Sequence, residues 1–277
     1  MLYLVGTPIG NMGDFSPRAQ EVLASVDVIA CEDTRRTGLL LQSCDIKNKL
    51  TAYHEHNKAA KGPVIINMLK EGLNVALVSD AGMPSINDPG EDLVKLAIEN
   101  DLDVTAIPGP VAAIDALVLS GLDTTKFHYE GFLPAQGGPR QKRLEKLRSY
   151  DETIIIYEAP HRLQKLIDGL IEVGFGDCQA AFCRELTKKY EQVLRMTVNE
   201  AREYYETTPP KGEFVICLEC LGAEDKQSDI VEEVDLDELI RQMSGEGKST
   251  KDIAKELSKT TGRNKKEIYD YVLNLLK

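Results

Sequence analysis

Short apolar runs alternate with stretches of helical periodicity through the first half of the chain. Four runs, each three to five residues long, are expected to be buried strands: Tyr3–Val5, Asp27–Cys31, Val75–Val78 and Val104–Ile107. The segments between them carry helix signals, such as Ser16 before a proline and a helical apolar spacing. A strand–helix–strand order predicts a parallel sheet with right-handed crossovers, so this half predicts an α/β domain.

A long loop follows the third of these strands. It covers Ser79–Gly90, whereas ordinary connections between a strand and a helix have about 2–6 residues. The following helix is expected to start with Asp88 as the cap and Pro89 in the first turn, and to continue over Asp92–Glu99. An earlier helix is expected at Pro63–Leu69. The length of the loop favours ligand binding at a strand end, and an ordinary surface connection is the alternative.

The second half predicts another α/β layer, with a more antiparallel sheet. Phe127–Leu133 is strand-like, and a loop rich in Gly and Pro separates it from a basic helix, Arg140–Leu147. Further strands are expected at Thr153–Tyr157, Gln179–Cys183 and Glu213–Leu218, with helices at His161–Val173 and Val198–Tyr205.

These patterns divide the chain into four segments. We expect an N-terminal α/β domain with a parallel sheet at 1–120, a C-terminal α/β domain at 121–222, an acidic linker at 223–235 and a helical tail at 236–277. The tail predicts one helix at Leu236–Met243, a second that begins at the capping-box-like Ser249, and a third that is capped by Asn264 after a break at Gly262. This segment is helix-turn-helix-like. It is interpreted either as an RNA contact or as a helical hairpin packed on the body of the protein.

Composition narrows the class of protein. The chain of 277 residues suits two domains, and no apolar run reaches the length of a membrane span. The start shows no signal peptide, and the six Cys suit reduced thiols, so we expect a cytoplasmic protein. The net charge of −12 argues against broad nucleic-acid affinity, but the basic residues are clustered. We expect no metal site, because Cys217 and Cys220 lack a second pair at zinc spacing and the His54-Glu55-His56 run lacks a third ligand.

Three loops are expected to meet at one edge of the first sheet. They are Gly6–Asn11, Ser79–Pro89 and Pro108–Ala113, each after a predicted strand. The chain contains neither a G-x-G-x-x-G fingerprint after its first strand nor a phosphate-binding P-loop. The loops therefore predict a cleft for a small ligand without phosphates.

Six short blocks carry a family resemblance. They are Gly6-Thr7-Pro8-Ile9-Gly10-Asn11, Glu32-Asp33-Thr34-Arg35-Arg36, Ser79-Asp80-Ala81-Gly82-Met83-Pro84, Pro108-Gly109-Pro110, Glu158-Ala159-Pro160-His161-Arg162 and Arg184-Glu185-Leu186-Thr187-Lys188. Together they resemble the tetrapyrrole-methylase superfamily and, within it, the bacterial small-subunit rRNA cytidine 2′-O-methyltransferases. The resemblance covers about residues 1–220 and, more loosely, the helical tail.

The resemblance implies a fold, a cofactor and a substrate. It implies two α/β domains with S-adenosylmethionine in the cleft between them, a homodimer, and methylation of a cytidine ribose in small-subunit rRNA. The residues that it places against the methyl donor are Pro8, Ser79, Asp80, Met83, Ile86, Val111, Ala112, Glu158, Leu186 and, at the adenine side, Glu213.

Methyl transfer to a ribose hydroxyl benefits from a general base. The candidates are Lys188, Glu185, Glu158 and His54. Lys188 qualifies only if burial or a neighbouring cation lowers its pKa. Each candidate has the alternative role of an ion-pair or RNA-binding residue, and His54 suits a hydrogen-bonded loop.

Two basic clusters are candidate RNA contacts. Arg35 and Arg36 follow an acidic pair at a strand end, where they either bind phosphates or form an internal Asp–Arg pair. Arg140, Lys142 and Arg143 lie on the basic helix, whose alternative is a solvated charged face. These clusters favour an RNA methyltransferase over its two rivals, a methylase of a porphyrin-like ring and a non-catalytic S-adenosylmethionine-binding module.

Overall fold

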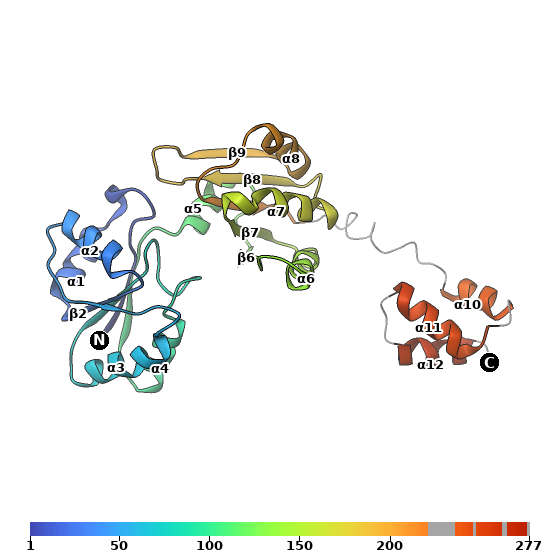
Figure 1. The fold of residues 1–277 in the computed structure, drawn as a ribbon, viewed down its shortest axis with the longest axis horizontal. Helices are drawn as coiled ribbons and strands as arrows, with labels where there is room; N and C mark the ends of the chain where they lie inside the picture. The colour runs from blue at the N-terminus through green and yellow to red at the C-terminus, as the bar shows by residue number, and fades with distance from the viewer. Residues whose placement is uncertain (221–235, 246–247, 262–264, 276–277) are drawn as a thin grey trace. The chain divides into compact units, whose positions relative to one another are not determined.

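The computed structural model describes residues 1–220, 236–245, 248–261 and 265–275 (Figure 1). The chain forms two compact units, Met1–Leu221 and Gly222–Lys277. The predicted linker at 223–235, the helix break at Gly262 and the cap at Asn264 lie outside the described residues.

The first sheet is parallel throughout, as predicted. Its five strands have the order β3-β2-β4-β1-β5. They are β1 (Leu2–Val5), β2 (Val28–Cys31), β3 (Leu50–Ala52), β4 (Val75–Val78) and β5 (Val104–Ile107). Since β4, β1 and β5 are neighbours, the three loops predicted to converge follow adjacent strands at the same edge.

Helices cover both faces of this sheet. On one face a short helix η1 (Met12–Asp14) leads into α1 (Pro17–Ser25), and α2 (Thr34–Ser43) follows β2. Leu23, Ile29 and Leu41 share the core on that face. On the other face α3 (Lys58–Lys70) and α4 (Glu91–Glu99) bury Ile65 and Leu93 against the strands. This covering explains why β4 is buried at all four positions and has an unbroken apolar sequence.

The second sheet has the order β6-β7-β10-β8-β9, and three of its four pairings are antiparallel. Its strands are β6 (Phe127–Phe132), β7 (Thr153–Glu158), β8 (Gln179–Arg184), β9 (Gln192–Thr197) and β10 (Phe214–Leu218). One face is covered by α6 (Gly138–Leu147), α7 (Pro160–Glu172) and α8 (Val198–Thr207). On the other face α5 (Ala112–Ser120) packs on β7, β8 and β10, and Tyr129, Tyr157 and Val193 are only partly buried beside it.

The unit Gly222–Lys277 contains the three helices predicted for the tail. They are α10 (Leu236–Gly245), α11 (Thr250–Thr261) and α12 (Lys265–Leu275). A small core joins them through apolar residues that include Ile240, Ile253 and Val272. The hydroxyl of Ser249 accepts a hydrogen bond from the Asp252 N–H at 3.3 Å, as the capping pattern predicts. None of the helices in the described part of the chain is long and apolar enough to cross a bilayer.

Two predicted helix starts are wrong. α4 begins at Glu91 after Gly90, whose φ of 144° takes the backbone out of helical geometry, so Asp88 and its proline lie in the loop and cap nothing. α3 begins at Lys58, so Pro63 lies inside the helix and not at its first turn. The missing hydrogen bond at Pro63 is offset by burial of the apolar residues that follow it.

Besides the short helix η1, three elements were not predicted. β3 and β9 are edge strands with half-buried, mixed sequences, so they lack the continuous apolar signal of the central strands. α2 starts within the block Glu32–Arg36, for which the sequence predicts binding residues but no helix. The run Val75–Val78 is therefore the fourth strand of the chain and not the third.

Candidate functional site

A cavity of about 400 Å³ lies between the loops of the first sheet and the face of the second sheet. This size is within the range of small-molecule sites. Its lining residues are Ile9, Ala81, Gly82, Met83, Ile86, Asn87, Asp88, Val111, Ala112, Phe132, Tyr157, Glu158, Ala159, Pro160, Cys183, Leu186, Lys188, Glu213, Phe214 and Val215. The lining is mainly apolar, with a few charged groups among the described residues.

Close backbone contacts bring the loops of the first sheet together. Thr7 and Gly82 exchange two backbone hydrogen bonds, of 2.9 and 3.1 Å. Gly6 faces Gly109 so closely that a β-carbon on Gly6 would lie 2.7 Å from the Gly109 Cα. A larger residue at either position would separate the loops after β1 and β5. These glycines therefore allow the close approach of the loops whose other residues line the cavity.

The predicted donor contacts divide between two hollows. Met83, Ile86, Val111, Ala112, Glu158, Leu186 and Glu213 line the large cavity. Pro8, Ser79 and Asp80 line a smaller hollow of about 170 Å³, together with Gly10, Met12, Arg36, Thr37 and Leu40. The loop after β1 and the loop after β4 each contribute residues to both hollows. The backbone hydrogen bonds between Thr7 and Gly82 join these two loops.

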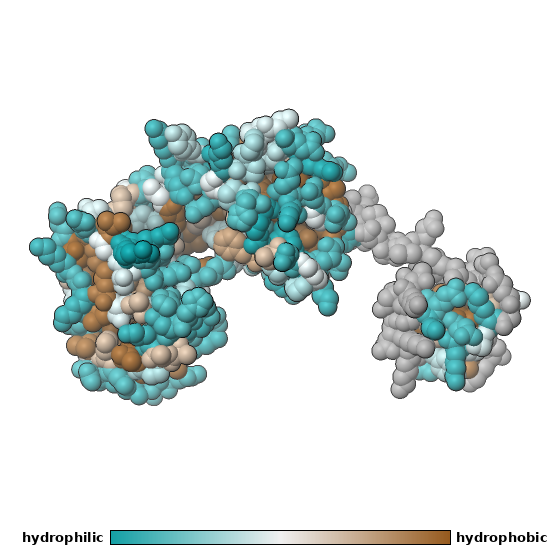
Figure 2. Space-filling model, viewed as in Figure 1, coloured by the Kyte–Doolittle hydropathy of each residue, from teal (hydrophilic) through white to brown (hydrophobic). Residues whose placement is uncertain are grey.

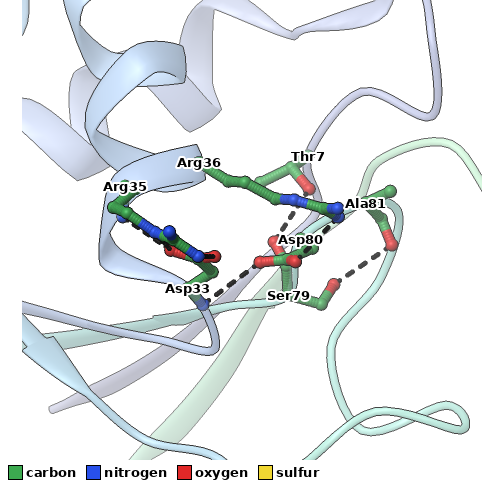
Figure 3. A network of polar contacts seen from close by, with 7 residues as sticks. All are labelled: Thr7, Asp33, Arg35, Arg36, Ser79, Asp80 and Ala81. Atoms are coloured by element: carbon green, nitrogen blue, oxygen red, sulfur yellow. Dashed lines mark hydrogen bonds and ion pairs between the residues drawn. The ribbon is translucent and has the colours of Figure 1, made fainter.

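Figure 3 shows the polar network beside the smaller hollow. Asp33 caps α2, and its carboxylate accepts from the Arg35 backbone and guanidinium, each at 2.8 Å. Asp80 accepts from the Asp33 N–H at 3.2 Å and from the Arg36 guanidinium at 3.0 Å. The Arg35 side chain holds the pKa of Asp33 well below its usual range. The alternative of an Asp–Arg pair is therefore present for both arginines, while their side chains stay 88% and 71% exposed and phosphate binding remains a prediction.

Lys188 lies between two carboxylates. Its ammonium is 2.9 Å from Glu185 and 2.7 Å from Glu213. Burial lowers the pKa of Lys188, but the hydrogen bonds to Glu213 and Glu185 outweigh it, and the net shift is upward. Lys188 therefore lacks the lowered pKa that the role of general base requires. Glu185 bonds Lys188 and the Glu213 N–H and does not line the cavity.

His54 is held in a loop, as its alternative predicted. Its N–H donates to Asn57 Oδ1 at 2.9 Å, and its Nε2 lies 3.2 Å from Asn57 Nδ2. It lines neither hollow, so we do not retain it as a catalytic residue. Among the described residues no three His, Cys, Asp or Glu side chains gather as metal ligands.

The basic helix α6 differs from its prediction at Arg140. The Arg140 side chain is 9% exposed, donates to the Pro134 carbonyl at 3.1 Å and lies 3.3 Å from the Glu158 carboxylate. Arg162 approaches the same carboxylate at 3.0 Å. A buried carboxylate needs such partners, so Arg140 is a structural residue and not an RNA contact. Arg143 pairs with Glu130 and remains partly exposed.

Lys142 is the predicted RNA contact of α6 that lies fully on the solvent side. Of the predicted RNA contacts, Arg35, Arg36 and Lys142 are exposed and Arg143 is partly exposed.

The sequence analysis missed Asp88 as a site residue, because it assigned the side chain to a helix cap. Asp88 lines the cavity, and burial and the nearby Glu32 carboxylate raise the pKa of its carboxyl to about 6. It also missed Phe132, Tyr157 and Phe214. A signal for these three was present, since each lies at or beside the predicted end of a strand in the second sheet.

Comparison with known proteins agrees with this geometry. The family model of the tetrapyrrole (corrin/porphyrin) methylases matches residues 1–202. The chain is similar to "Ribosomal RNA small subunit methyltransferase I" of a Synechocystis species, with 42% identity over 99% of this chain and 98% of that protein. The Bacillus subtilis protein of the same name is 41% identical over 98% of this chain and 93% of its own length.

Solved structures share the fold at lower identity. The uroporphyrin-III-C-methyltransferase of Thermus thermophilus aligns with a TM-score of 0.55 and 20% identity, over 78% of this chain and 93% of that one. A cobalt precorrin-4 methyltransferase aligns with a TM-score of 0.57 and 17% identity over the same shares. The two sheets, the cavity that they line and the family match lead to one conclusion: this chain belongs to the tetrapyrrole (corrin/porphyrin) methylase family.

Proposed function

We propose that the protein transfers a methyl group from S-adenosylmethionine to the ribose 2′-hydroxyl of a cytidine in small-subunit rRNA. The observation that carries the proposal is the match, over nearly the whole chain, to relatives named as small-subunit rRNA methyltransferases. The cavity and the exposed arginines near it supply the physical support.

The cavity fits the chemistry of the methyl donor. Apolar walls from Val111, Leu186 and Phe214 suit the adenosine. Lys188 is the one cation among the described lining residues and suits the carboxylate of the methionyl group, while Glu213 suits its ammonium. When bound, the donor supplies a methyl group on a positively charged sulfur. Carboxylates at the cavity, such as Asp88, suit that charge.

The residues of the chain position the reactants and exclude water. The paired backbone of Thr7 and Gly82 fixes the loop that carries Met83 and Ile86. Fixed loops favour a methyl transfer that depends on the alignment of the reactants. Holding two reactants in the reactive geometry lowers the activation barrier. The apolar side chains of this loop limit the access of water to the reacting atoms.

RNA contact is proposed for the exposed cations. Arg35 and Arg36 lie on α2 and Lys142 and Arg143 on α6, and phosphate contacts of this kind position a nucleic acid without reading its sequence. Their existing carboxylate partners orient the guanidinium groups. We extend the proposal to the helical tail, whose role is RNA docking.

The proposed assembly is a cytoplasmic homodimer. Large apolar side chains remain on the surface of α5, where Val118 is 66%, Ile114 41% and Leu119 37% exposed. Hydrophilic residues cover most of the face of residues 1–220 seen in Figure 2, so apolar side chains on α5 are a candidate for a subunit contact. Light scattering at several protein concentrations measures the assembly directly.

Labelled methyl transfer separates the proposal from its rivals. The protein is incubated with methyl-labelled donor and either small ribosomal subunits or a tetrapyrrole precursor, and the RNA is digested to nucleosides for mass spectrometry. We expect 2′-O-methylcytidine from the subunits. Label only in the tetrapyrrole supports the rival function, methylation of a porphyrin-like ring. A uroporphyrin-III-C-methyltransferase is among the solved structures that share the fold. Donor binding without transfer to either substrate supports a non-catalytic module.

A further inference from the structure

Four charged side chains line the cavity in the described part of the chain: Asp88, Glu158, Lys188 and Glu213. Three of them are neutralised by partners. Glu158 is buried between Arg140 and Arg162, and Lys188 pairs with Glu213. Asp88 differs, because none of the described cations forms an ion pair with it. A partly buried carboxylate without a cationic partner lowers the stability of the fold, and such groups are concentrated at functional sites.

The surroundings of Asp88 are acidic or neutral. Glu32 follows β2 and Asp80 follows β4, and both carboxylates act on Asp88. The Ser79 hydroxyl also acts on Asp88, and it donates to the Ala81 and Gly82 carbonyls, each at 3.2 Å. From the second sheet it faces the phenols of Tyr129 on β6 and Tyr157 on β7, whose pKa values are raised by burial, so both are neutral at pH 7.

The loop holds Asp88 in a strained backbone. Ser85 and Asn87 have φ angles of 71° and 64°, in the left-handed region that non-glycine residues rarely adopt. The Asn87 amide donates to the Tyr129 hydroxyl, which ties this loop to the second sheet. A residue held in this region is strained, and the strain persists only where the surroundings enforce it. The strain flanks Asp88, so its place in the wall is imposed by the fold.

We propose that Asp88 is the general base that accepts the proton of the attacking ribose hydroxyl. The inference rests on the proposed function. As the hydroxyl oxygen forms its bond to the methyl carbon, the bond between that carbon and sulfur breaks, and its electron pair stays on sulfur to give a neutral thioether. The hydroxyl proton moves to a carboxylate oxygen of Asp88 and is later lost to water. Positive charge leaves the sulfur as negative charge leaves Asp88, so the step creates no net charge in the cavity.

The ionisation of Asp88 suits this role. With a pKa of about 6 it is ionised at neutral pH, yet it is a stronger base than an ordinary aspartate. Lys188 has the opposite property, since its raised pKa keeps it protonated. Asp88, in the loop after β4, therefore suits the role of base better than Lys188 does.

Single-turnover methylation of small ribosomal subunits against pH tests the role. Wild type is expected to lose activity below about pH 6, with an acid limb that reports Asp88. Asp88→Asn should lower the rate about 100-fold or more and abolish the limb, and Asp88→Glu should restore part of the rate with a displaced limb. Glu213→Gln removes a paired carboxylate from the same cavity and serves as the control. It should raise the KM for the donor and leave the limb in place.

A binding measurement without RNA provides a second readout. Calorimetry compares S-adenosylmethionine with its neutral product, S-adenosylhomocysteine, between about pH 5 and 8. Ionised Asp88 favours the positive sulfur, so the preference for S-adenosylmethionine should fall several-fold below pH 6 in wild type and stay level in Asp88→Asn. An Asp88→Asn enzyme with the wild-type rate and limb overturns the base role alone. A wild type that methylates no ribosomal RNA overturns the proposed function and the base role together.

Discussion

Asp88 and Lys188 line the same cavity from the two sheets and have opposite surroundings. Lys188 lies 2.9 and 2.7 Å from two carboxylates. Asp88 has other carboxylates as its charged neighbours, and none of the described cations forms an ion pair with it. Both pKa values are raised, yet the consequences differ. The raised pKa fixes a permanent charge on Lys188, whereas it brings Asp88 within reach of proton transfer at neutral pH.

This difference assigns separate tasks to the two walls. The wall from the second sheet carries a neutralised ion cluster that suits the binding of a charged ligand. The wall from the first sheet carries a strained loop and an unneutralised carboxylate, which suits chemistry. Residues of both walls line the cavity, and the hydrogen bond from Asn87 to Tyr129 links the two walls.

The largest effect is expected from removing the cation of the second wall. Lys188→Met should weaken binding of S-adenosylmethionine about 10- to 100-fold, because a charge-assisted hydrogen bond contributes about 1.5–3 kcal/mol. Isothermal titration calorimetry measures the affinity. Lys189→Met makes the same change at the adjacent exposed position and should bind as wild type. Equal affinities for the two variants would remove Lys188 from the donor site.

A smaller effect, on stability, is expected at the first wall. The folded state raises the pKa of Asp88 to about 6, so this carboxyl favours folding at low pH, and that contribution is lost as pH rises from about 4 to about 6. Asp88→Asn removes this penalty and should stabilise the protein at pH 7 by about 1 kcal/mol, because solvent screens part of the cost of the charge.

Thermal unfolding at pH 7 and at about pH 4 measures this change. The gain should be present at pH 7 and vanish at the lower pH. Glu99→Gln changes an exposed carboxylate of α4 and should have no such pH dependence. A destabilised Asp88→Asn at pH 7 would mean that the carboxylate contributes to folding and is not strained for function.

The smallest effect is expected for the exposed arginines, where charge is paired but solvated. Arg36→Gln should weaken binding to small ribosomal subunits only a few-fold and should reduce the slope of log affinity against log salt by about one. Arg18→Gln, on α1, changes an exposed arginine outside the Asp80 network and is the control. Equal slopes for the two variants would leave the Arg36–Asp80 ion pair as a purely structural contact.

The basic helix illustrates where sequence reasoning succeeded and failed. A run of arginine and lysine predicted α6 and its charge, and both are present. The run did not reveal that Arg140 turns inward to Glu158, which is 18 residues away, or that Arg143 pairs with Glu130. Each partner belongs to another element, so the local sequence gives no signal for the pairing.

Local sequence determined the parallel strands, the Ser16 and Ser249 caps and the glycine-rich loops, because strand burial, capping and close backbone approach depend on the residues themselves and their near neighbours. The tertiary structure alone decided which charges meet. The sequence predicts Asp88 as a helix cap, but the φ of Gly90 leaves Asp88 outside the helix, where it lines the cavity. The sequence makes Lys188 a candidate base, but its ammonium is paired with Glu185 and Glu213. A pKa is set by burial and by charges within a few ångströms. Glu185 is near Lys188 along the chain, but Glu213 is 25 residues from Lys188, and Glu32 is distant from Asp88.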